Sequence, residues 1–460
     1  MIKIKCILIG IDLTVIFISI LLMNKTTKKA FFVTPLIITC ILSSLLVGFQ
    51  DKLVLKRTYK NSYKEMQEVI NYITDKDNSF YRISNNEYVA ENPNRIFGNI
   101  NYRTSTVYSS LSNQEYNNFY FNVMNNNIPH RNRALTSSTN NLLFLLFSNN
   151  KYVVGRNKPL HGYEKIYEKN GINVYRNNHT LPFAFATSNI MNYEDFSKLS
   201  PEQKEEALLH NIITNDKTST DYVSYVQPID VNLDKILNKK YIKKNTDGSY
   251  TLNVRNGEKI TINLPEQYQN KIIFISFNMN VNQTCAIGDQ SIKINNVKNK
   301  LTCKEWIYYN NNTNFTYTIS EEDLTKLTIS IGKGVYNISD IRVYYLDYAS
   351  IENINKKVDK LLVDMNDTKG DHIFGSIDVS KDGYFIMTVP YDDGFNIKVD
   401  GKKVAYEKVD SAFVGFKIAK GHHEIEVEYT APLKNISLAF TQLALIIFCI
   451  VTYLESKRKF

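Results

Sequence analysis

The chain has 460 residues, of which 43% are hydrophobic, and its formal net charge is +9. This length accommodates about two to four domains, and the apolar share is enough to bury real cores. Five cysteines are too few for a disulfide scaffold, and no CxxC pair or HExxH sequence occurs. We predict no metal site, because the histidines show no zinc-ligand spacing beyond His422 and His423, which suit a solvated hairpin edge.

Three apolar stretches are long enough to cross a bilayer, which needs about 20 residues. They cover residues 4–23, 30–49 and 433–454. The loop between the first two and the tail after the third are both basic, and basic flanks tend to stay in the cytoplasm. We therefore expect a multi-pass protein of a bacterial cell membrane, with the bulk of the chain on the extracytoplasmic side.

Asp12 falls inside the first predicted span, where a carboxylate is costly. Two interpretations are open: a functional group, or a polar seam in which the carboxylate pairs with other helices. The exterior cysteines also leave a question open. Cys285 and Cys303 can form a disulfide in an oxidising compartment, but their spacing does not show that their Cα atoms approach closely enough.

Residues 50–215 alternate helical and strand patterns, which predicts an extracytoplasmic α/β domain. Apolar positions at helical spacing favour helices over 63–75 and 113–124. Ser200-Pro-Glu-Gln203 is a strong helix start, with a capping hydroxyl, a proline in the first turn and a glutamine three residues after the cap. The expected helix runs to about Ile212.

The pattern changes to short alternating strands in residues 216–348, which is typical of a β-sandwich of jelly-roll type. The expected strands cover 250–254, 259–264, 272–280, 291–295, 315–319, 327–331 and 341–346. Residues 349–431 then predict a linker helix, over 348–365, and a small antiparallel β module with a tight hairpin at Asp400-Gly401. Residues 432–460 hold the third membrane helix and a basic cytoplasmic tail, so the expected fold class is a membrane-anchored α+β protein with three transmembrane helices.

Several short motifs resemble the C-terminal part of the YfhO family of bacterial polytopic membrane proteins. Upstream motifs at 108–113, 150–154, 175–177 and 181–185 come in the order that the family has. The closing motifs are Val389-Pro-Tyr-Asp-Asp-Gly394, Val399-Asp-Gly401, Ala412-Phe-Val-Gly415, Lys420-Gly-His-His-Glu424 and Glu428-Tyr-Thr-Ala-Pro432.

This resemblance implies an integral-membrane glycosyltransferase that takes a sugar from a lipid-phosphate donor and adds it to lipoteichoic acid or a related envelope polymer. The catalytic carboxylates of such enzymes, one of which helps to hold a divalent metal, usually lie in the first exterior loop of a multi-helix membrane domain. No counterpart of that loop is found here. The expectation is a C-terminal portion from a split, truncated or partially predicted gene, with unknown catalytic residues and no cofactor of its own. If the gene is split, a separately encoded N-terminal membrane half is an expected partner.

Four residues are candidates for substrate binding. Tyr108, Ser109 and Ser110 match the family and are expected near a membrane-facing active site, although a turn that caps the helix at Asn113 explains them equally well. Trp306, with Tyr308 and Tyr309 nearby, suits either a sugar-stacking platform or a plug of the sandwich core, and the core plug is the preferred interpretation. Tyr391-Asp-Asp393 is interpreted as a solvated turn.

The expected partners are membrane lipid, a polyprenyl-phosphate sugar and a teichoic-acid-like polymer, since a net positive charge attracts anionic headgroups and cell-wall polymers. Nucleic acid is not expected outside the membrane. The alternative from another functional class is a non-enzymatic, membrane-anchored protein that binds carbohydrate or envelope polymer. The abundant asparagines are interpreted as turn-compatible residues.

Overall fold

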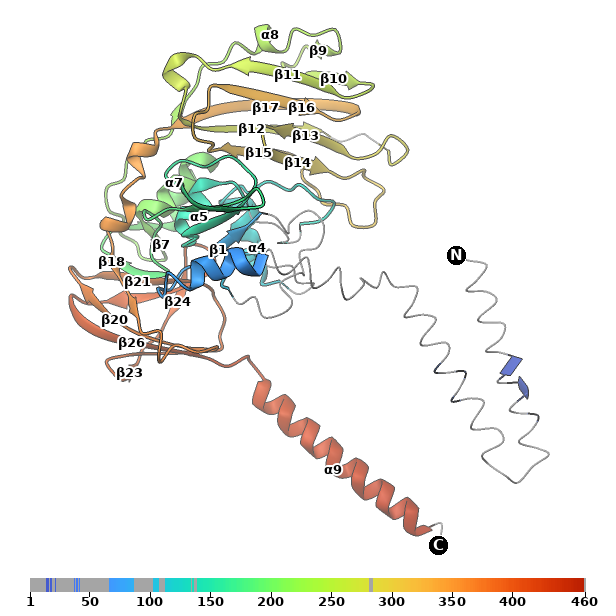
Figure 1. Cartoon of the computed structure of the whole chain (residues 1–460), viewed down its shortest axis with the longest axis vertical. Helices are drawn as coiled ribbons and strands as arrows, with labels where there is room; N and C mark the ends of the chain where they lie inside the picture. Colours follow the sequence, from blue (N-terminus) through green and yellow to red (C-terminus); the bar gives the residue numbers. More distant parts are fainter. Residues whose placement is uncertain are drawn as a thin grey trace. The chain divides into compact units, whose positions relative to one another are not determined.

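A computed structural model gives the fold of this chain (Figure 1). It describes residues 66–86, 102–106, 112–133, 135, 139–280 and 284–458, with isolated helical positions within 14–21 and 37–41. Asp12 and most of the first two predicted spans lie outside the described residues, and so do Tyr108, Ser109 and Ser110. The chain divides into the units Met1–Glu68 and Val69–Phe460, and the features below belong to the second.

Helix α9 (Lys434–Arg458) is apolar enough over Lys434–Leu454 to cross a membrane. Its large apolar side chains, such as Phe440 and Phe448, are exposed, as expected of a helix surrounded by lipid. The third predicted span therefore has a matching helix. The structure does not show the first two predicted spans, because they fall mostly outside the described residues.

The first part of the unit is a four-stranded sheet with buried helices beside it. Within this unit, helical residues 69–74 precede the sheet. Its strands β1 and β2 are parallel neighbours, and its other pairs are antiparallel. In sheet order, the strands are β1 (Ile83–Asn85), β2 (Tyr152–Gly155), β4 (Ile172–Arg176) and β3 (Glu164–Lys169). The helices are α4 (Gln114–Asn118), which continues into a π-helical turn at Phe119–Val123, and α5 (Leu142–Phe147), α6 (Tyr193–Lys198) and α7 (Pro201–His210). Strands β6 (Ile190–Asn192) and β7 (Ile212–Thr214) form a parallel pair, and α6 and α7 lie between them in the sequence.

Helix α7 begins with the capping box that its sequence predicts. The Ser200 hydroxyl accepts a hydrogen bond from the Gln203 N–H at 3.3 Å, and the Gln203 side chain accepts one from the Ser200 N–H at 3.0 Å. Replacing Ser200 by alanine leaves one of these donors without a partner, so we expect Ser200→Ala to lower the free energy of unfolding by about 1 kcal/mol. Urea titration of the full chain measures this loss, and an unchanged midpoint would show that water replaces the cap.

Two antiparallel sheets form a sandwich around one apolar core (Figure 1). The first sheet has the order β15 (Asn314–Ile319), β12 (Ile272–Asn280), β17 (Gly334–Leu346), β10 (Tyr250–Val254) and β9 (Ile242–Lys244), with β8 (Gln227–Pro228) also on β17. The second has the order β11 (Glu258–Asn263), β16 (Lys326–Ile331), β13 (Gln290–Ile294) and β14 (Val297–Leu301). All seven strands predicted here are present, and β17 begins seven residues earlier than its prediction.

Two five-stranded sheets form the closing module. One has the order β18 (Asp359–Lys360), β5 (Ala184–Thr187), β21 (Gly383–Pro390), β25 (Phe413–Ile418) and β24 (Glu407–Val409). The other has the order β19 (Leu362–Val363), β20 (His372–Val379), β26 (Gly421–Tyr429), β22 (Phe395–Val399) and β23 (Lys402–Lys403). The predicted hairpin joins β22 to β23, with Asp400 and Gly401 both at positive φ.

The linker helix predicted over 348–365 is wrong. The segment instead forms two 3₁₀ turns, Tyr348–Ser350 and Ile354–Lys356, and then the short strands β18 and β19. Its buried apolar residues belong to different cores: Ile351 and Ile354 pack in the core of the α/β part, whereas Leu361 packs between the sheets of the closing module, and Leu362 is 55% exposed. One straight helix cannot present a single apolar face to two separate cores.

Candidate functional site

A cleft of about 720 Å³ opens at one end of the closing module. Its walls come from strands β20, β21, β22 and β26, and two segments of the α/β part, around Phe80–Arg82 and Arg103–Thr104, complete it. Its charged and amide-bearing lining residues are Arg82, Arg103, Asn113, Asp371 and Asp392. The fold therefore places two guanidinium groups in one hollow with two carboxylates.

Arg82 is buried at the back of the cleft and is held by oxygen atoms of neutral groups. Its guanidinium donates to the Ser148 carbonyl at 2.9 Å, to the Thr388 hydroxyl at 2.9 Å and to the Thr388 carbonyl at 2.6 Å. Burial lowers the pKa of Arg82 to about 10, so the group stays cationic at neutral pH. Among the described residues, no carboxylate lies within ion-pair distance of it. No acidic group among those residues neutralises this positive charge.

Arg103 supplies the second cation, and its side chain is exposed. Its guanidinium carbon lies 4.1 Å from the centre of the Phe80 ring, which orients the group without neutralising it. The part of the chain that the structure describes offers Arg103 no ion-pair partner either. A planar guanidinium with free donors matches the geometry of phosphate and carboxylate oxygens.

The rim of the cleft is a tight turn at the end of β21. Asn113 caps α4 and donates from its side chain to the Tyr391 carbonyl at 3.1 Å, while Asp392 accepts from the Gly394 N–H at 2.8 Å. A side chain at Gly394 would meet the Thr430 carbonyl oxygen at 2.3 Å, so the close approach of the two strands requires glycine. The turn is polar, as its sequence predicts, and Asp392 also lines the cleft.

The cleft is close to the membrane helix along the chain. Tyr429 lines it, and α9 begins at Lys434, only five residues later. Five residues span at most about 17 Å even when they are fully extended. One wall of the cleft therefore lies, along the chain, within this distance of the helix that is apolar enough to cross a membrane. Two guanidinium groups bind an anion, and Asp371 and Asp392 can accept hydrogen bonds from hydroxyl groups.

Trp306 does not plug the sandwich core, so the preferred interpretation of this residue is wrong. It lies half-buried in a turn after Cys303, where its backbone N–H donates to the Cys303 carbonyl at 3.1 Å. The Arg131 guanidinium carbon lies 4.4 Å from its ring centre. Ile307 and Tyr308, the next two residues, are 81% and 69% exposed. The turn thus presents aromatic and apolar groups to solvent, which keeps the sugar-platform interpretation open.

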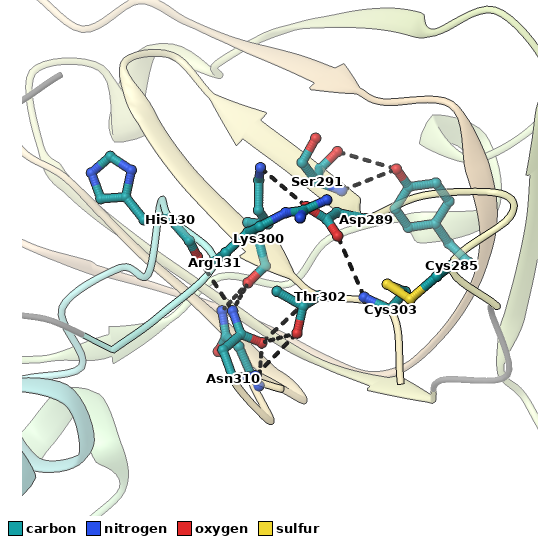
Figure 2. A network of polar contacts seen from close by, with 11 residues as sticks. His130, Arg131, Cys285, Asp289, Ser291, Lys300, Thr302, Cys303 and Asn310 are labelled. Atoms are coloured by element: carbon teal, nitrogen blue, oxygen red, sulfur yellow. Dashed lines mark hydrogen bonds and ion pairs between the residues drawn. A yellow bond between two sulfur atoms is a disulfide. The ribbon is translucent and has the colours of Figure 1, made fainter. Parts of the chain in front are cut away.

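The base of this turn is a dense polar network (Figure 2). Asp289 accepts from Arg131 at 2.8 Å and lies 3.3 Å from the Lys300 ammonium, and Cys285 is joined to Cys303 by a disulfide with a Cα–Cα distance of 4.9 Å. Asn310 is buried and binds Thr302 and the carbonyl of Lys300 (Figure 2). The two cysteines therefore pair. At least one asparagine of the 310–312 run, Asn310, has a structural role, because its side chain bonds two segments of the turn to each other.

One further group among the described residues has the donor set for a cation. Ligand atoms of His372, Glu426 and Glu428 lie within 4.8 Å of one another on the neighbouring strands β20 and β26. The Lys398 ammonium already lies 3.1 Å from Glu426, and it competes for the same carboxylate. His422 and His423 lie on β26 and bind Asp378 and Asp400 at 2.7 and 2.8 Å. We assign no metal to these groups.

Residues 2–441 match the family model of the bacterial membrane protein YfhO. The chain belongs to the YfhO family. A relative of Bacillus subtilis (strain 168), called uncharacterized protein YfhO, is 25% identical over an alignment of 408 residues, which covers 86% of this chain and 45% of the relative. The chain thus spans about half the length of this YfhO protein.

Two solved structures resemble this member of the YfhO family weakly. A Paenibacillus cycloisomaltooligosaccharide glucanotransferase is 7% identical, with 41% of this chain and 43% of that chain covered and a TM-score of 0.14. A Bacteroides uniformis β-glucuronidase is 10% identical, with 40% and 21% covered and a TM-score of 0.13. Similarity at this level supports no conclusion about fold or function.

Arg82 and Arg103 are the two site residues that sequence reasoning missed. Each is a single arginine without a spacing that signals a ligand. Their significance comes from partners far along the chain, since Arg82 bonds to Thr388 across 306 residues. The one available signal was indirect: Asn113 and Tyr391-Asp-Asp-Gly394 are family-matched, and they prove to lie at the same rim.

Proposed function

We propose that this chain is the extracytoplasmic portion of a YfhO-family glycosyltransferase, which transfers a sugar from a lipid-phosphate donor to an envelope polymer such as lipoteichoic acid. In this proposal the arginine cleft binds the phosphate of the donor headgroup, and the catalytic carboxylates belong to a separate membrane portion. Family membership supports the reaction class. The single structural observation that carries the assignment is a pair of cations, Arg82 and Arg103, without acidic partners among the described residues. They line a cleft that Tyr429 also lines, five residues before a membrane helix begins.

Binding of a lipid-phosphate sugar tests the role of Arg103. With the full chain in lipid nanodiscs and a short-chain polyprenyl-phosphate hexose as the probe, we expect Arg103→Ala to weaken binding about tenfold, the effect of one lost charge-assisted contact of about 1.4 kcal/mol. Arg103 is exposed, so this variant keeps the fold. Arg255→Ala is the matched control, because Arg255 is an exposed arginine of the sandwich that lies outside the cleft. Equal affinities for wild type and Arg103→Ala would overturn the assignment.

The orientation of the exterior portion is a separate part of the proposal. Lys381 lies in the exposed turn between β20 and β21, so a Lys381→Cys variant presents a thiol to the solvent. We expect a membrane-impermeant maleimide to label this thiol in intact cells as fully as in lysed cells. Labelling that appears only after lysis would place the closing module in the cytoplasm and would refute the orientation.

The Trp306 turn favours a second candidate function, the binding of an envelope carbohydrate without catalysis. Exposed aromatic rings stack on sugar faces, and Tyr308 is the most exposed ring of this turn. Sedimentation of the full chain in nanodiscs with purified cell-wall polymer compares the wild type with a Trp306→Ala, Tyr308→Ala double variant. Loss of co-sedimentation in the double variant, with retention in Arg103→Ala, would favour this function over sugar transfer.

A further inference from the structure

The interior of the β-sandwich is incompletely filled. A cavity of about 500 Å³ lies between the two sheets, and its lining is predominantly aliphatic. Ile275 and Val343 contribute from one sheet, and Ile262, Ile294 and Ile329 contribute from the other. Protein interiors normally pack as densely as organic crystals and leave few voids larger than one water molecule. This volume instead falls in the range of ligand-binding cavities.

Several inward-facing side chains remain only partly buried although they belong to the core. Ile262, Ile329, Ile341 and Val343 all line the cavity and pack against the core cluster, yet each keeps an accessible surface. Burial of apolar surface stabilises a protein by about 25 cal/mol per Å², and the exposed parts of these side chains do not contribute this free energy. A ligand that covers these side chains would recover that free energy, whereas a polar ligand would lose hydrogen bonds to water on entering.

The mouth of the cavity has a cationic side. The segment 229–239, which includes the short helix α8 (Leu233–Ile236), lies across one end of the cavity. Lys235 and Lys239 line it, are exposed and have no ion-pair partner among the residues described, whereas Lys244 is already paired with Asp234. Asp230 is the one acidic residue of the lining. Two lysines against one aspartate favour an anionic group at this end.

We propose that the sandwich binds one unbranched acyl chain, with an anionic headgroup near Lys235 and Lys239. At about 30 Å³ per methylene, close to the share that a water molecule takes in the liquid, the cavity holds a chain of about 12 to 16 carbons. A branched polyprenyl chain of many isoprene units exceeds this capacity. The site goes beyond the proposed function, because no residue of the cavity belongs to the arginine cleft.

Photo-crosslinking tests this site on the full chain in lipid nanodiscs. The probe is a 16-carbon fatty acid with a diazirine at mid-chain, and peptide mass spectrometry locates the adducts. We expect adducts within 229–239 and on the strands β11, β12 and β16, and competition by unlabelled palmitate and by lysophosphatidylglycerol. Palmitate has a carboxylate headgroup and lysophosphatidylglycerol has a phosphate headgroup, so the relative strength of their competition shows which anion the site prefers. Adducts confined to α9, or competition only by polyprenyl phosphate, would overturn the proposal.

Cavity-filling variants decide whether the interior is the site. Ile262→Trp and Val343→Trp each place an indole in the cavity, and we expect either change to reduce labelling at least about tenfold. Val335→Trp is the matched control, because Val335 is an exposed position of β17 outside the lining, and it should label like the wild type. Lys235→Glu with Lys239→Glu leaves the cavity intact and should weaken labelling about tenfold. Undiminished labelling in both cavity variants, with their circular dichroism unchanged, would refute the interior site.

Discussion

The free energy of unfolding is expected to fall as the pH rises from 6.5 to 8, because Glu205 gives up a proton that the folded state retains. Glu205 lies on α7 and is 1% exposed. Its two carboxyl oxygens accept hydrogen bonds from the Asn125 and Asn141 side-chain amides at 3.0 and 2.8 Å. Burial outweighs these bonds and raises the pKa of Glu205 from 4.5 to about 8.

The direction of the effect follows from proton linkage. An unfolded glutamate has lost its proton above pH 6.5, whereas folded Glu205 still holds most of its own, so the folded state binds more protons and loses stability as the pH rises. Between pH 6.5 and 8 the loss is about 2 kcal/mol. His210 acts in the opposite direction at lower pH, because burial lowers its pKa to about 4. Its effect makes the folded state more stable as the pH rises from about 4 to 6.5, and most of this pH dependence is over near pH 6.5.

Urea unfolding at pH 6.5, 7.25 and 8 measures this slope on the full chain. Glu205→Gln keeps the size of the side chain and removes the titration, so we expect the variant to lack about 2 kcal/mol of the pH dependence. Glu194→Gln is the matched control, because Glu194 lies on the neighbouring helix α6 and its side chain is 83% exposed. If Glu205→Gln shows the same slope as the wild type, Glu205 is ionised in the folded protein at neutral pH.

Removal of the disulfide between Cys285 and Cys303 is expected to cost about 3 kcal/mol of sandwich stability. The bond closes a loop with a sequence separation of 18 residues, and cross-links of this length restrict the unfolded chain by about that amount. The cost should appear where the disulfide is, in the turn that carries Trp306. Trp306 is the one tryptophan of the chain, so its fluorescence reports on this turn alone.

The variant for this test is the double change Cys285→Ser, Cys303→Ser. We expect its tryptophan emission to change at a lower urea concentration than that of the wild type, because Trp306 leaves the Arg131 guanidinium as the turn opens. Cys449→Ser, in the exposed surface of α9, controls for the loss of a thiol without the loss of a bond. Coincident unfolding curves, or two free thiols at positions 285 and 303 in the extracted protein, would contradict the prediction.

Local features of this protein follow from its sequence alone. The seven sandwich strands, the Asp400-Gly401 hairpin, the Ser200 capping box and the apolar helix before the basic tail all depend on periodicity or turn chemistry within a few residues. The family assignment also follows from short motifs in order. These signals are local in the chain, so they persist whatever the distant segments do.

Long-range packing decided the rest. Arg82 and Arg103 form a site because residues 80–82 and 103–104 pack against strands within 372–429. The segment 348–365 does not form its predicted helix, because Ile354 and Leu361 belong to different cores. Trp306 lies in a solvent-accessible turn and not in the predicted core position. The space between the sandwich sheets is not completely filled by side chains. Such outcomes depend on which surfaces meet and how completely side chains from remote strands fill the space between them. No pattern within a single segment contains that information.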